Sequence, residues 1–279
     1  MQAGEPSRTA RAAAFHRAAH QVLESGRIFA DPLALRILGE DADAVARRAE
    51  AHPSARRMRI FIAVRTRFAE DALAAAVERG VRQLVVLGAG LDTYAYRGEL
   101  RDRLRIFEVD HPATQAWKRQ RLASAGIPWP AGLTFAPVDF ERETVAEGLS
   151  AAAFDPEQRT FFTWLGVVPY LTGEAVWSTL GFMASLRNGA DVVFDYGEPP
   201  ETLPPEMRAS HDRRAALVAE MGEAFVSYFE PDKLRGGLRE LGFRELEDLG
   251  PCQIAARYFP NRAASVPARG GHVVRAATV

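Results

Sequence analysis

The sequence predicts an α/β protein with a parallel sheet at its centre. From residue 83 onward, short apolar segments typical of buried strands alternate with segments that have helical periodicity, which implies right-handed β-α-β crossovers. Residues 84–87 form a continuous apolar run, as expected of a strand buried on both faces. We therefore expect a helical N-terminal cap over residues 1–80 and a ligand-binding core over residues 81–279, with a helical insertion at about 197–230.

Composition narrows the class of protein. The chain of 279 residues is 47% hydrophobic and 25% charged, as is usual for soluble globular proteins. A formal net charge of −1 gives no basic surface for nucleic acid. With one cysteine we expect no internal disulfide, and with no apolar segment of about 18 residues we expect a cytoplasmic protein without membrane partners. The number of subunits is left open.

The cap is predicted to consist of four helices, at residues 11–23, 32–38, 41–51 and 59–79. The last of them carries Arg65 and Arg67, which lie on different faces of a helix because they are two positions apart. A guanidinium group that faces the carboxyl edge of the sheet could bind a ligand carboxylate in a bidentate manner, whereas one on the outer face would be solvated.

A glycine turn follows the first strand and marks the ligand site. Gly88, Ala89 and Gly90 precede Asp92 or Thr93, either of which can cap a helix, and glycine allows the backbone to approach a nucleotide closely. The dinucleotide motif G-x-G-x-x-G has threonine here as its last residue. Asp92 would also repel a pyrophosphate.

A second acidic residue supports a nucleoside ligand with a cationic end. Asp110 closes the next predicted strand, twenty positions after Gly90, at the spacing expected for a carboxylate that binds ribose hydroxyls. Together with Asp92, this spacing favours S-adenosylmethionine over a nicotinamide dinucleotide.

The alternation continues through the core. Residues 206–226 are predicted to be an inserted helix that either closes over the site as a lid or packs as an ordinary helix. The last strand is expected to pair antiparallel with its predecessor. The expected strands are 83–87, 104–109, 133–138, 159–165, 190–195, 243–249 and 272–276, and the expected helices are 92–100, 112–125, 141–152, 173–187 and 231–241.

Four stretches in this order carry a family resemblance: VVLGAGLDTYAYR, FEVDHPATQAWKRQRL, PVDFERE and FFTWLGVVPYLTGEAV. Over roughly residues 15–200 the sequence resembles the leucine carboxyl methyltransferase-like family of class I S-adenosylmethionine-dependent methyltransferases, including bacterial O-methyltransferases of polyketide biosynthesis. The resemblance implies a doubly wound, Rossmann-like sheet of seven strands. It also implies S-adenosylmethionine as cofactor and a small-molecule methyl acceptor.

The resemblance also suggests which residues bind the cofactor. Arg67 matches the arginine that holds the methionine carboxylate, with Arg65 as the alternative. Gly88, Ala89 and Gly90 would line the methionine and ribose, and Asp110 would bind the ribose hydroxyls. Asp139 and Phe140 match a pair that holds the adenine amino group and packs against the ring. Leu165 stands where several relatives have a cofactor-binding glutamate, so this position departs from the family pattern.

Candidates for the acceptor pocket stand near predicted strand ends or in the insertion. They are Trp164, Tyr170, Asp195, Tyr196 and His211, each of which could equally be a packing, strand-terminating or surface residue. A carboxylate acceptor would need no general base at pH 7, whereas a hydroxyl acceptor would benefit from one. No catalytic residue is assigned.

Three functions are therefore weighed. The first is an O-methyltransferase that acts on a carboxylate or hydroxyl of a small molecule, with secondary metabolism as a candidate setting. The second is an NAD(P)-dependent oxidoreductase on the same type of sheet, which the absent third glycine and Asp92 disfavour. The third is a cofactor-binding protein without turnover, for which Leu165 is the argument.

Overall fold

The computed structural model describes residues 7–140, 143–220, 222–261 and 266–279. Its centre is one seven-stranded sheet with the strand order β3-β2-β1-β4-β5-β7-β6. The first five strands are parallel, and β7 pairs antiparallel with both β5 and β6. This confirms the predicted α/β fold. The strands are β1 Gln83–Leu87, β2 Arg105–Asp110, β3 Leu133–Pro137, β4 Thr160–Trp164, β5 Ala190–Gly197, β6 Glu245–Leu249 and β7 Gly271–Ala277.

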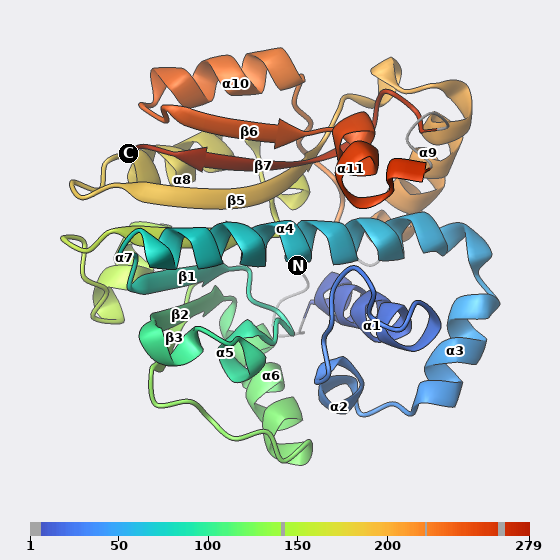
Figure 1. Cartoon of the computed structure of the whole chain (residues 1–279), viewed down its shortest axis with the longest axis horizontal. Helices are drawn as coiled ribbons and strands as arrows, with labels where there is room; N and C mark the ends of the chain where they lie inside the picture. The colour runs from blue at the N-terminus through green and yellow to red at the C-terminus, as the bar shows by residue number, and fades with distance from the viewer. Residues whose placement is uncertain (1–6, 141–142, 221, 262–265) are drawn as a thin grey trace.

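Helices cover both faces of the sheet, and further helices extend beyond its carboxyl edge (Figure 1). The long helix α4 runs along the strands over the middle of one face of the sheet, so this part of the predicted cap forms a layer of the core. The helices are α1 Arg8–Leu23, α2 Ala34–Leu38, α3 Ala42–Glu50, α4 Arg56–Glu78, α5 Tyr94–Arg97, α6 Pro112–Ser124, α7 Val145–Ala151, α8 Gly173–Ala184, α9 Pro205–Glu220, α10 Pro231–Glu240 and α11 Pro251–Tyr258.

The alternation of side chains along β1 shows why its sequence is apolar throughout. Leu84 and Val86 belong to the buried cluster on the side of α1 to α6 and α11. Val85 and Leu87 belong to the cluster on the opposite side, which receives α7, α8 and α10. Because both faces of a strand in a parallel sheet are covered, every residue of β1 is buried.

Several predicted boundaries were wrong for local reasons. The helix expected at 92–100 is the single turn α5, and the chain leaves it at Gly98. The helix expected at 141–152 begins only at α7, where Thr144 and Glu147 form a capping box; residues 141 and 142 lie outside the described part. Helix α11 was not predicted, because its eight residues carry too short a pattern.

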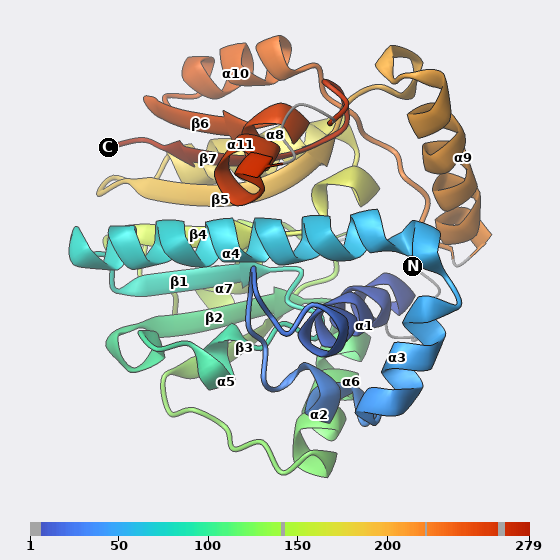
Figure 2. The same cartoon turned by 45° about the vertical axis from the view of Figure 1, so that its right-hand side comes forward.

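The N-terminal helices are bound directly to the glycine turn. Arg17 in α1 donates to the carbonyl oxygen of Leu91 at 2.6 Å and to Asp31 at 2.9 Å. Thr93 donates to the same Asp31 carboxylate at 2.9 Å. These buried contacts hold α1 beside the carboxyl edge of the sheet, as seen after the rotation in Figure 2.

Candidate active site

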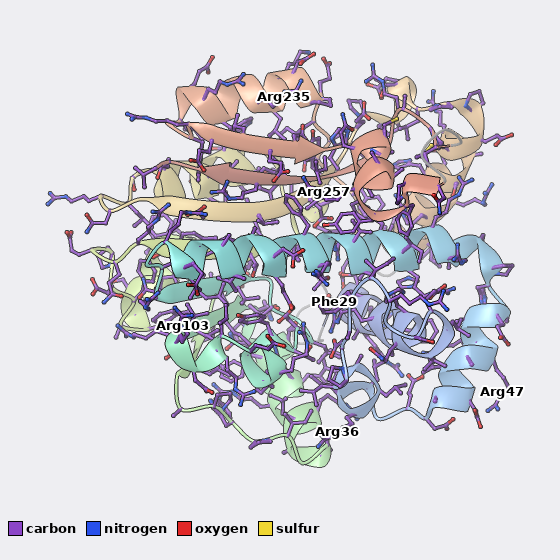
Figure 3. The ribbon with its side chains drawn as sticks, in the orientation of Figure 1. Phe29, Arg36, Arg47, Arg103, Arg235 and Arg257 are labelled. Carbon is purple, nitrogen blue, oxygen red and sulfur yellow. The ribbon has the colours of Figure 1, made fainter. Side chains whose placement is uncertain are left out.

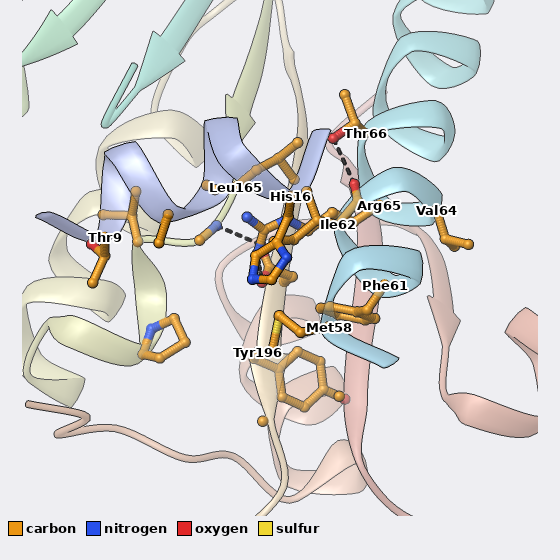
Figure 4. Close-up of a pocket in the computed structure, with 18 of the residues that line it drawn as sticks. Thr9, His16, Met58, Phe61, Ile62, Val64, Arg65, Thr66, Leu165 and Tyr196 are labelled. Atoms are coloured by element: carbon orange, nitrogen blue, oxygen red, sulfur yellow. Dashed lines mark hydrogen bonds and ion pairs between the residues drawn. The ribbon is translucent and has the colours of Figure 1, made fainter. Parts of the chain in front are cut away.

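A cavity of about 1650 Å³ opens at the carboxyl edge of the sheet. It lies over the ends of β1 and β4, where the strand order reverses and α/β proteins bind their ligands. A pocket for one small molecule occupies roughly 300–1,000 Å³, so the cavity has room for a cofactor and a second molecule. Its walls come from α1, the start of α4, the strand ends and α9; Figure 4 shows part of it.

The glycine turn has no room for other side chains. Gly88 and Gly90 both have left-handed backbone conformations, with φ of 63° and 45°. A Cβ atom on Gly88 would lie 2.2 Å from Cγ2 of Val167, and one on Gly90 would lie 2.8 Å from Cβ of Ala10. Asp92 accepts a hydrogen bond from the Tyr94 amide at 2.8 Å, which starts α5. Both glycines are therefore required by conformation and by space.

Asp110 connects the end of β2 to this turn. One carboxylate oxygen accepts from the Gly90 amide at 2.6 Å and the other from the His111 amide at 2.7 Å. Burial raises the pKa of Asp110 above its usual value, and the two amides oppose this shift. The carboxylate is thus fixed in orientation at the wall of the cavity.

Most of the site residues expected from the sequence converge on the cavity. Asp139 and Phe140 follow β3, and Leu165 follows β4 with its side chain packed against the core. The expected residues that line the cavity are Gly88, Ala89, Gly90, Asp110, Asp139, Phe140, Leu165, Tyr170, Asp195, Tyr196 and His211.

Arg67 is not among them, and its predicted placement was wrong. Its side chain is 51% exposed, and its Nε lies 2.8 Å from the carboxylate of Asp71, one turn further along α4. Arg65 lies on the opposite face, lines the cavity and donates to Asp195 at 2.7 Å. Its buried Nε has no partner among the described residues. A helix turns by about 200° in two residues, so only one of the two arginines can face the sheet edge.

Trp164 also lies away from the cavity. It is 1% exposed and packs on the face of α8 and α10, where its ring centroid lies 6.1 Å from that of Phe194. Strand alternation explains the error: its neighbours Thr163 and Leu165 line the cavity, so the side chain between them points to the other face.

The remaining aromatic candidates line the cavity, with two of their polar groups already bound to protein. Tyr196 donates to Asp248 at 2.8 Å, and its ring stacks on His272 at 4.8 Å. His211 Nε2 lies 2.9 Å from the Tyr228 hydroxyl. Burial raises the pKa of Tyr170 to about 12, so its phenol is neutral at physiological pH. Tyr196 and His211 therefore present mainly ring surface to a ligand.

Comparison with known proteins agrees with this geometry. Residues 10–184 match the family model described as leucine carboxyl methyltransferase. The chain belongs to the leucine carboxyl methyltransferase family. This places it among the S-adenosylmethionine-dependent methyltransferases and confirms the family and the cofactor class expected from the sequence, rather than a nicotinamide cofactor.

Two bacterial relatives illustrate the likeness. YktD of Bacillus subtilis (strain 168), provisionally named an S-adenosyl-L-methionine-dependent methyltransferase, is 35% identical over 202 residues, 71% of this chain and 66% of the relative. Franean1_4929 of Parafrankia sp. (strain EAN1pec), named likewise, is 42% identical over 120 residues, 43% of this chain and 38% of the relative. The matched stretches thus span less than two thirds of these relatives' lengths.

A solved structure supports the fold of the family member described here. A protein from Thermobifida fusca YX, provisionally described as a methyltransferase, aligns with a TM-score of 0.58 at 18% identity. The alignment covers 99% of this chain and 96% of that chain, so the likeness extends over the whole fold.

Several residues that line the cavity of this methyltransferase-family fold were not expected from the sequence, among them His16 and Arg214. His16 in α1 lies beside Arg65 in Figure 4, and its buried Nδ1 has no partner among the described residues. Burial lowers the pKa of His16 to about 4, with Arg59, Arg65 and Arg214 adding to the shift, so the ring is neutral at pH 7. Arg214 in α9 also lines the cavity. The sequence predicts helices at both places but not that they border one cavity.

Apart from Arg65 and Arg214, this wall of the cavity is largely apolar. Met58, Phe61 and Tyr196 lie below His16 in Figure 4, and Ile62 lies beside it. No group of three or more potential metal ligands occurs among the described residues, and no helix in the same part of the chain is long and apolar enough to cross a membrane.

Proposed function

We propose that this protein transfers the methyl group of S-adenosylmethionine to an oxygen atom, carboxylate or hydroxyl, of a small molecule. The observation that carries the proposal is the division of one large cavity into two chemically different parts. The glycine turn, Asp110, Asp139 and Phe140 border the part over β1 to β3. Apolar and aromatic side chains from α4, α9 and α11 border the rest.

The first part suits a nucleoside. The left-handed glycines bring the backbone of the turn to the cavity surface. Asp110, already oriented by two amides, offers its remaining lone pairs to ribose hydroxyls. Asp139 offers an acceptor for the adenine amino group and Phe140 an apolar wall for the ring.

Arg65 suits the carboxylate of the methionine portion, in place of Arg67. Its contact with Asp195 fixes the guanidinium plane at the ends of β4 and β5, while its Nε is left without a protein partner. A planar carboxylate in the cavity can accept hydrogen bonds from the guanidinium N–H groups that the Asp195 contact leaves free. Leu165 supplies no charge here, so the amino-acid end of the cofactor relies on Arg65.

The second part suits an acceptor with an apolar or aromatic body. Phe61, Met207, Ile254 and Tyr258 contribute to its walls from three helices. The cofactor supplies a methyl group already activated by the positive sulfonium. The protein therefore has to hold the acceptor oxygen in line with that methyl group and exclude water, and orientation alone can contribute about 7–11 kcal/mol in model reactions.

Titration of matched arginine variants tests the cofactor half. We expect wild-type protein to bind S-adenosylhomocysteine, which Arg65→Lys should weaken at least about tenfold, since a bidentate site does not accept lysine. Arg67→Lys is the control and should bind within about twofold of wild type, because its side chain lies outside the cavity. Adenosine, which lacks the carboxylate, should bind both variants equally.

Other outcomes would decide against the proposal. If Arg67→Lys weakened binding of S-adenosylhomocysteine as much as Arg65→Lys does, the role proposed for Arg65 would be wrong. Binding of NAD but not of the adenosyl compounds would contradict a methyltransferase. Cofactor binding without transfer to any acceptor in a broad screen would indicate a binding protein instead.

A further inference from the structure

A histidine and a tyrosine on the wall of the cavity are hydrogen-bonded to each other. His211 in α9 is 8% exposed, and its Nε2 lies 2.9 Å from the hydroxyl oxygen of Tyr228. On the other side of the ring, Nδ1 lies 3.0 Å from the carboxylate of Asp212. Both His211 and Tyr228 line the cavity, whereas Asp212 is exposed. The three side chains therefore form one hydrogen-bonded chain that runs from the cavity wall to the outside.

The carboxylate of Asp212 fixes the direction of these hydrogen bonds. A carboxylate only accepts, so Nδ1 of His211 carries a proton and Nε2 carries a lone pair. Tyr228 therefore donates its hydroxyl proton to Nε2. The oxygen of a hydroxyl that donates one bond keeps its lone pairs for a second hydroxyl group. A hydroxyl, a histidine ring and a carboxylate in this order form the arrangement by which enzymes activate oxygen nucleophiles.

This arrangement occurs once among the histidines that line the cavity in the described part of the chain. His20 lies between Glu24 and the Ile28 amide. His111 accepts from a backbone amide at the start of α6, and Nδ1 of His16 has no partner in the described part. Only His211 thus lies between a hydroxyl group and a carboxylate.

The segment after α9 holds Tyr228 beside the end of β5. The amide of the next residue, Phe229, donates to the carbonyl oxygen of Gly197 at 3.0 Å. Two positions earlier in the same strand, Asp195 pairs with Arg65, which we propose to hold the amino-acid end of the cofactor. Tyr228 is therefore fixed at the edge of the sheet that carries the proposed cofactor site.

The charges around Tyr228 suit a group that passes a proton on. Burial raises the pKa of Tyr228; Arg214 opposes this shift, and Asp212 and Glu201 add to it. The phenol is thus protonated at neutral pH and donates to His211. An imidazolium at His211 would lie against Asp212, whose side chain is 60% exposed and gives the proton a path to solvent.

We propose that Tyr228 and His211 together remove the proton from a hydroxyl group of the methyl acceptor, and hence that the acceptor is a phenol or an enol. The inference rests on the proposed function and selects one of its two acceptor classes. Tyr228 is a catalytic residue, because its oxygen touches the acceptor hydroxyl. His211 accepts the proton through Tyr228, and Asp212 is a positioning residue.

The chemistry of the relay determines the acceptor class. A carboxylate has no proton to give at pH 7, so a relay of this kind would be idle. An aliphatic alcohol holds its proton too strongly for a histidine to accept it. Phenols and enols lie between these limits, and their flat apolar bodies suit the aromatic and aliphatic walls contributed by Phe61 and Ile254.

Protons and electrons balance in the transfer step. The acceptor oxygen forms a bond to the methyl carbon while the carbon–sulfur bond breaks, and the electron pair of that bond stays on sulfur. The acceptor proton moves to the Tyr228 oxygen as the Tyr228 proton moves to Nε2 of His211. The products are a methyl ether, S-adenosylhomocysteine and a protonated His211, which releases its proton to solvent past Asp212.

Ionisation of a bound phenol tests the relay without turnover. 4-Nitrophenol absorbs visible light only as the phenolate, so its titration into protein saturated with S-adenosylhomocysteine at about pH 6 reports ionisation on binding. We expect the phenolate fraction of the bound probe to be at least about fivefold higher in wild type than in Tyr228→Phe or His211→Gln. Glutamine can accept the hydrogen bond from Tyr228 but cannot take its proton, which separates proton transfer from packing.

Two features of this comparison isolate the relay. Arg214 is present in every protein, so its attraction for a phenolate is common to all of them. Arg213→Gln is the control, because Arg213 is exposed on the same helix and does not line the cavity; it should keep the wild-type phenolate fraction.

Binding of S-adenosylhomocysteine separates this inference from the proposed function. All variants should bind it as wild type does. Failure of the wild type to bind it would count against the proposed function, and the same 4-nitrophenol titrations without cofactor would then decide the relay. A phenolate fraction that is unchanged in His211→Gln, or no binding of 4-nitrophenol to the wild type, would overturn the relay.

The pH dependence of 2-naphthol methylation gives a second readout. With the relay, kcat/KM should level off above about pH 7, where histidine is neutral. In His211→Gln it should be about 100-fold lower at pH 7 and should continue to rise toward about pH 9, as the naphthol itself ionises. A wild-type profile that also rises to pH 9 would contradict proton transfer to His211.

Discussion

At the scale of single residues, a buried ion pair joins β2 to α6 close to Asp110, which lines the cavity. Lys118 Nζ lies 2.6 Å from Oε2 of Glu108, and both side chains are 1% exposed. Burial raises the pKa of Glu108 to about 7, and the ammonium group opposes that shift. Lys118 also lies 5.5 Å from the centre of the Tyr96 ring. Each charge depends on the other, since neither reaches water.

Breaking this pair should be costly, whereas replacing both charges should not. We expect Lys118→Met to lower the free energy of unfolding by about 3–5 kcal/mol, because it leaves Glu108 buried without a counter-charge. The double variant Glu108→Gln with Lys118→Met should recover most of this loss. Urea denaturation of the two single variants and the double variant measures the coupling. A cost below about 1 kcal/mol for Lys118→Met would show that the pair is solvated.

His16 gives a residue-scale prediction on pH. In the unfolded chain its pKa lies near 6.5, whereas the folded protein lowers the pKa to about 4. Between these values the unfolded state binds a proton that the folded state does not. The contribution of His16 to stability is therefore complete above about pH 6.5 and is lost as the pH falls toward 4.

The variant His16→Asn isolates this effect, because His20, whose pKa burial also lowers, is present in both proteins. The unfolding free energy of wild type minus that of the variant should decrease from pH 7.5 to pH 5. Denaturant titrations at both values measure it. A difference that does not change with pH would mean that the His16 ring is protonated as readily in the folded state.

At the scale of elements, the start of α1 is joined to the insertion across the cavity. The carboxylate of Glu223 accepts hydrogen bonds from the Arg8 amide at 2.8 Å, from the Ser7 hydroxyl at 3.1 Å and from Thr9. An acid at a helix N-terminus satisfies free amides and interacts favourably with the helix dipole. All of these residues except Arg8 line the cavity. They join α1 to the segment after α9 at the wall of the cavity.

Removing this contact should speed ligand exchange. A cap of this type contributes about 1 kcal/mol, so Glu223→Ala should raise the dissociation rate of S-adenosylhomocysteine about fivefold. Stopped-flow displacement measures the rate. Glu220→Ala, at the exposed end of α9, is the control and should leave it unchanged. An unaltered rate in Glu223→Ala would mean that ligands enter by another route and that the insertion does not act as a lid.

Comparison of the predicted with the observed elements shows which features of the fold the sequence predicts. All seven strands were predicted, because apolar runs and the turns that bound them are local signals, and Asp110 was placed by its distance from Gly90. The orientation of Arg65 and Arg67 depends on which face of α4 contacts the sheet. Tertiary packing determines that face, and it also brings α1 to the glycine turn through Arg17; neither can be predicted from local sequence.

At the scale of the whole molecule, the arginine-rich composition has a structural counterpart. Many arginines lie at the surface of separate elements, among them Arg36, Arg47, Arg103, Arg235 and Arg257 (Figure 3). Several pair with acids, as Arg103 does with Glu78 at 2.7 Å. Such exposed pairs contribute about 0–1 kcal/mol each. Their main effect is to intersperse charges of both signs, in keeping with a formal net charge of −1.

The strand order imposes a sequence of events on biosynthesis. Strand β7 is the last to be made, yet it lies between β5 and β6 and pairs with both. Until β7 emerges from the ribosome, the partly made sheet exposes the unpaired backbone of β5, and β6 has no neighbour. Open strand edges promote association between chains. The edge of β5 therefore stays open to association until β7 pairs with it.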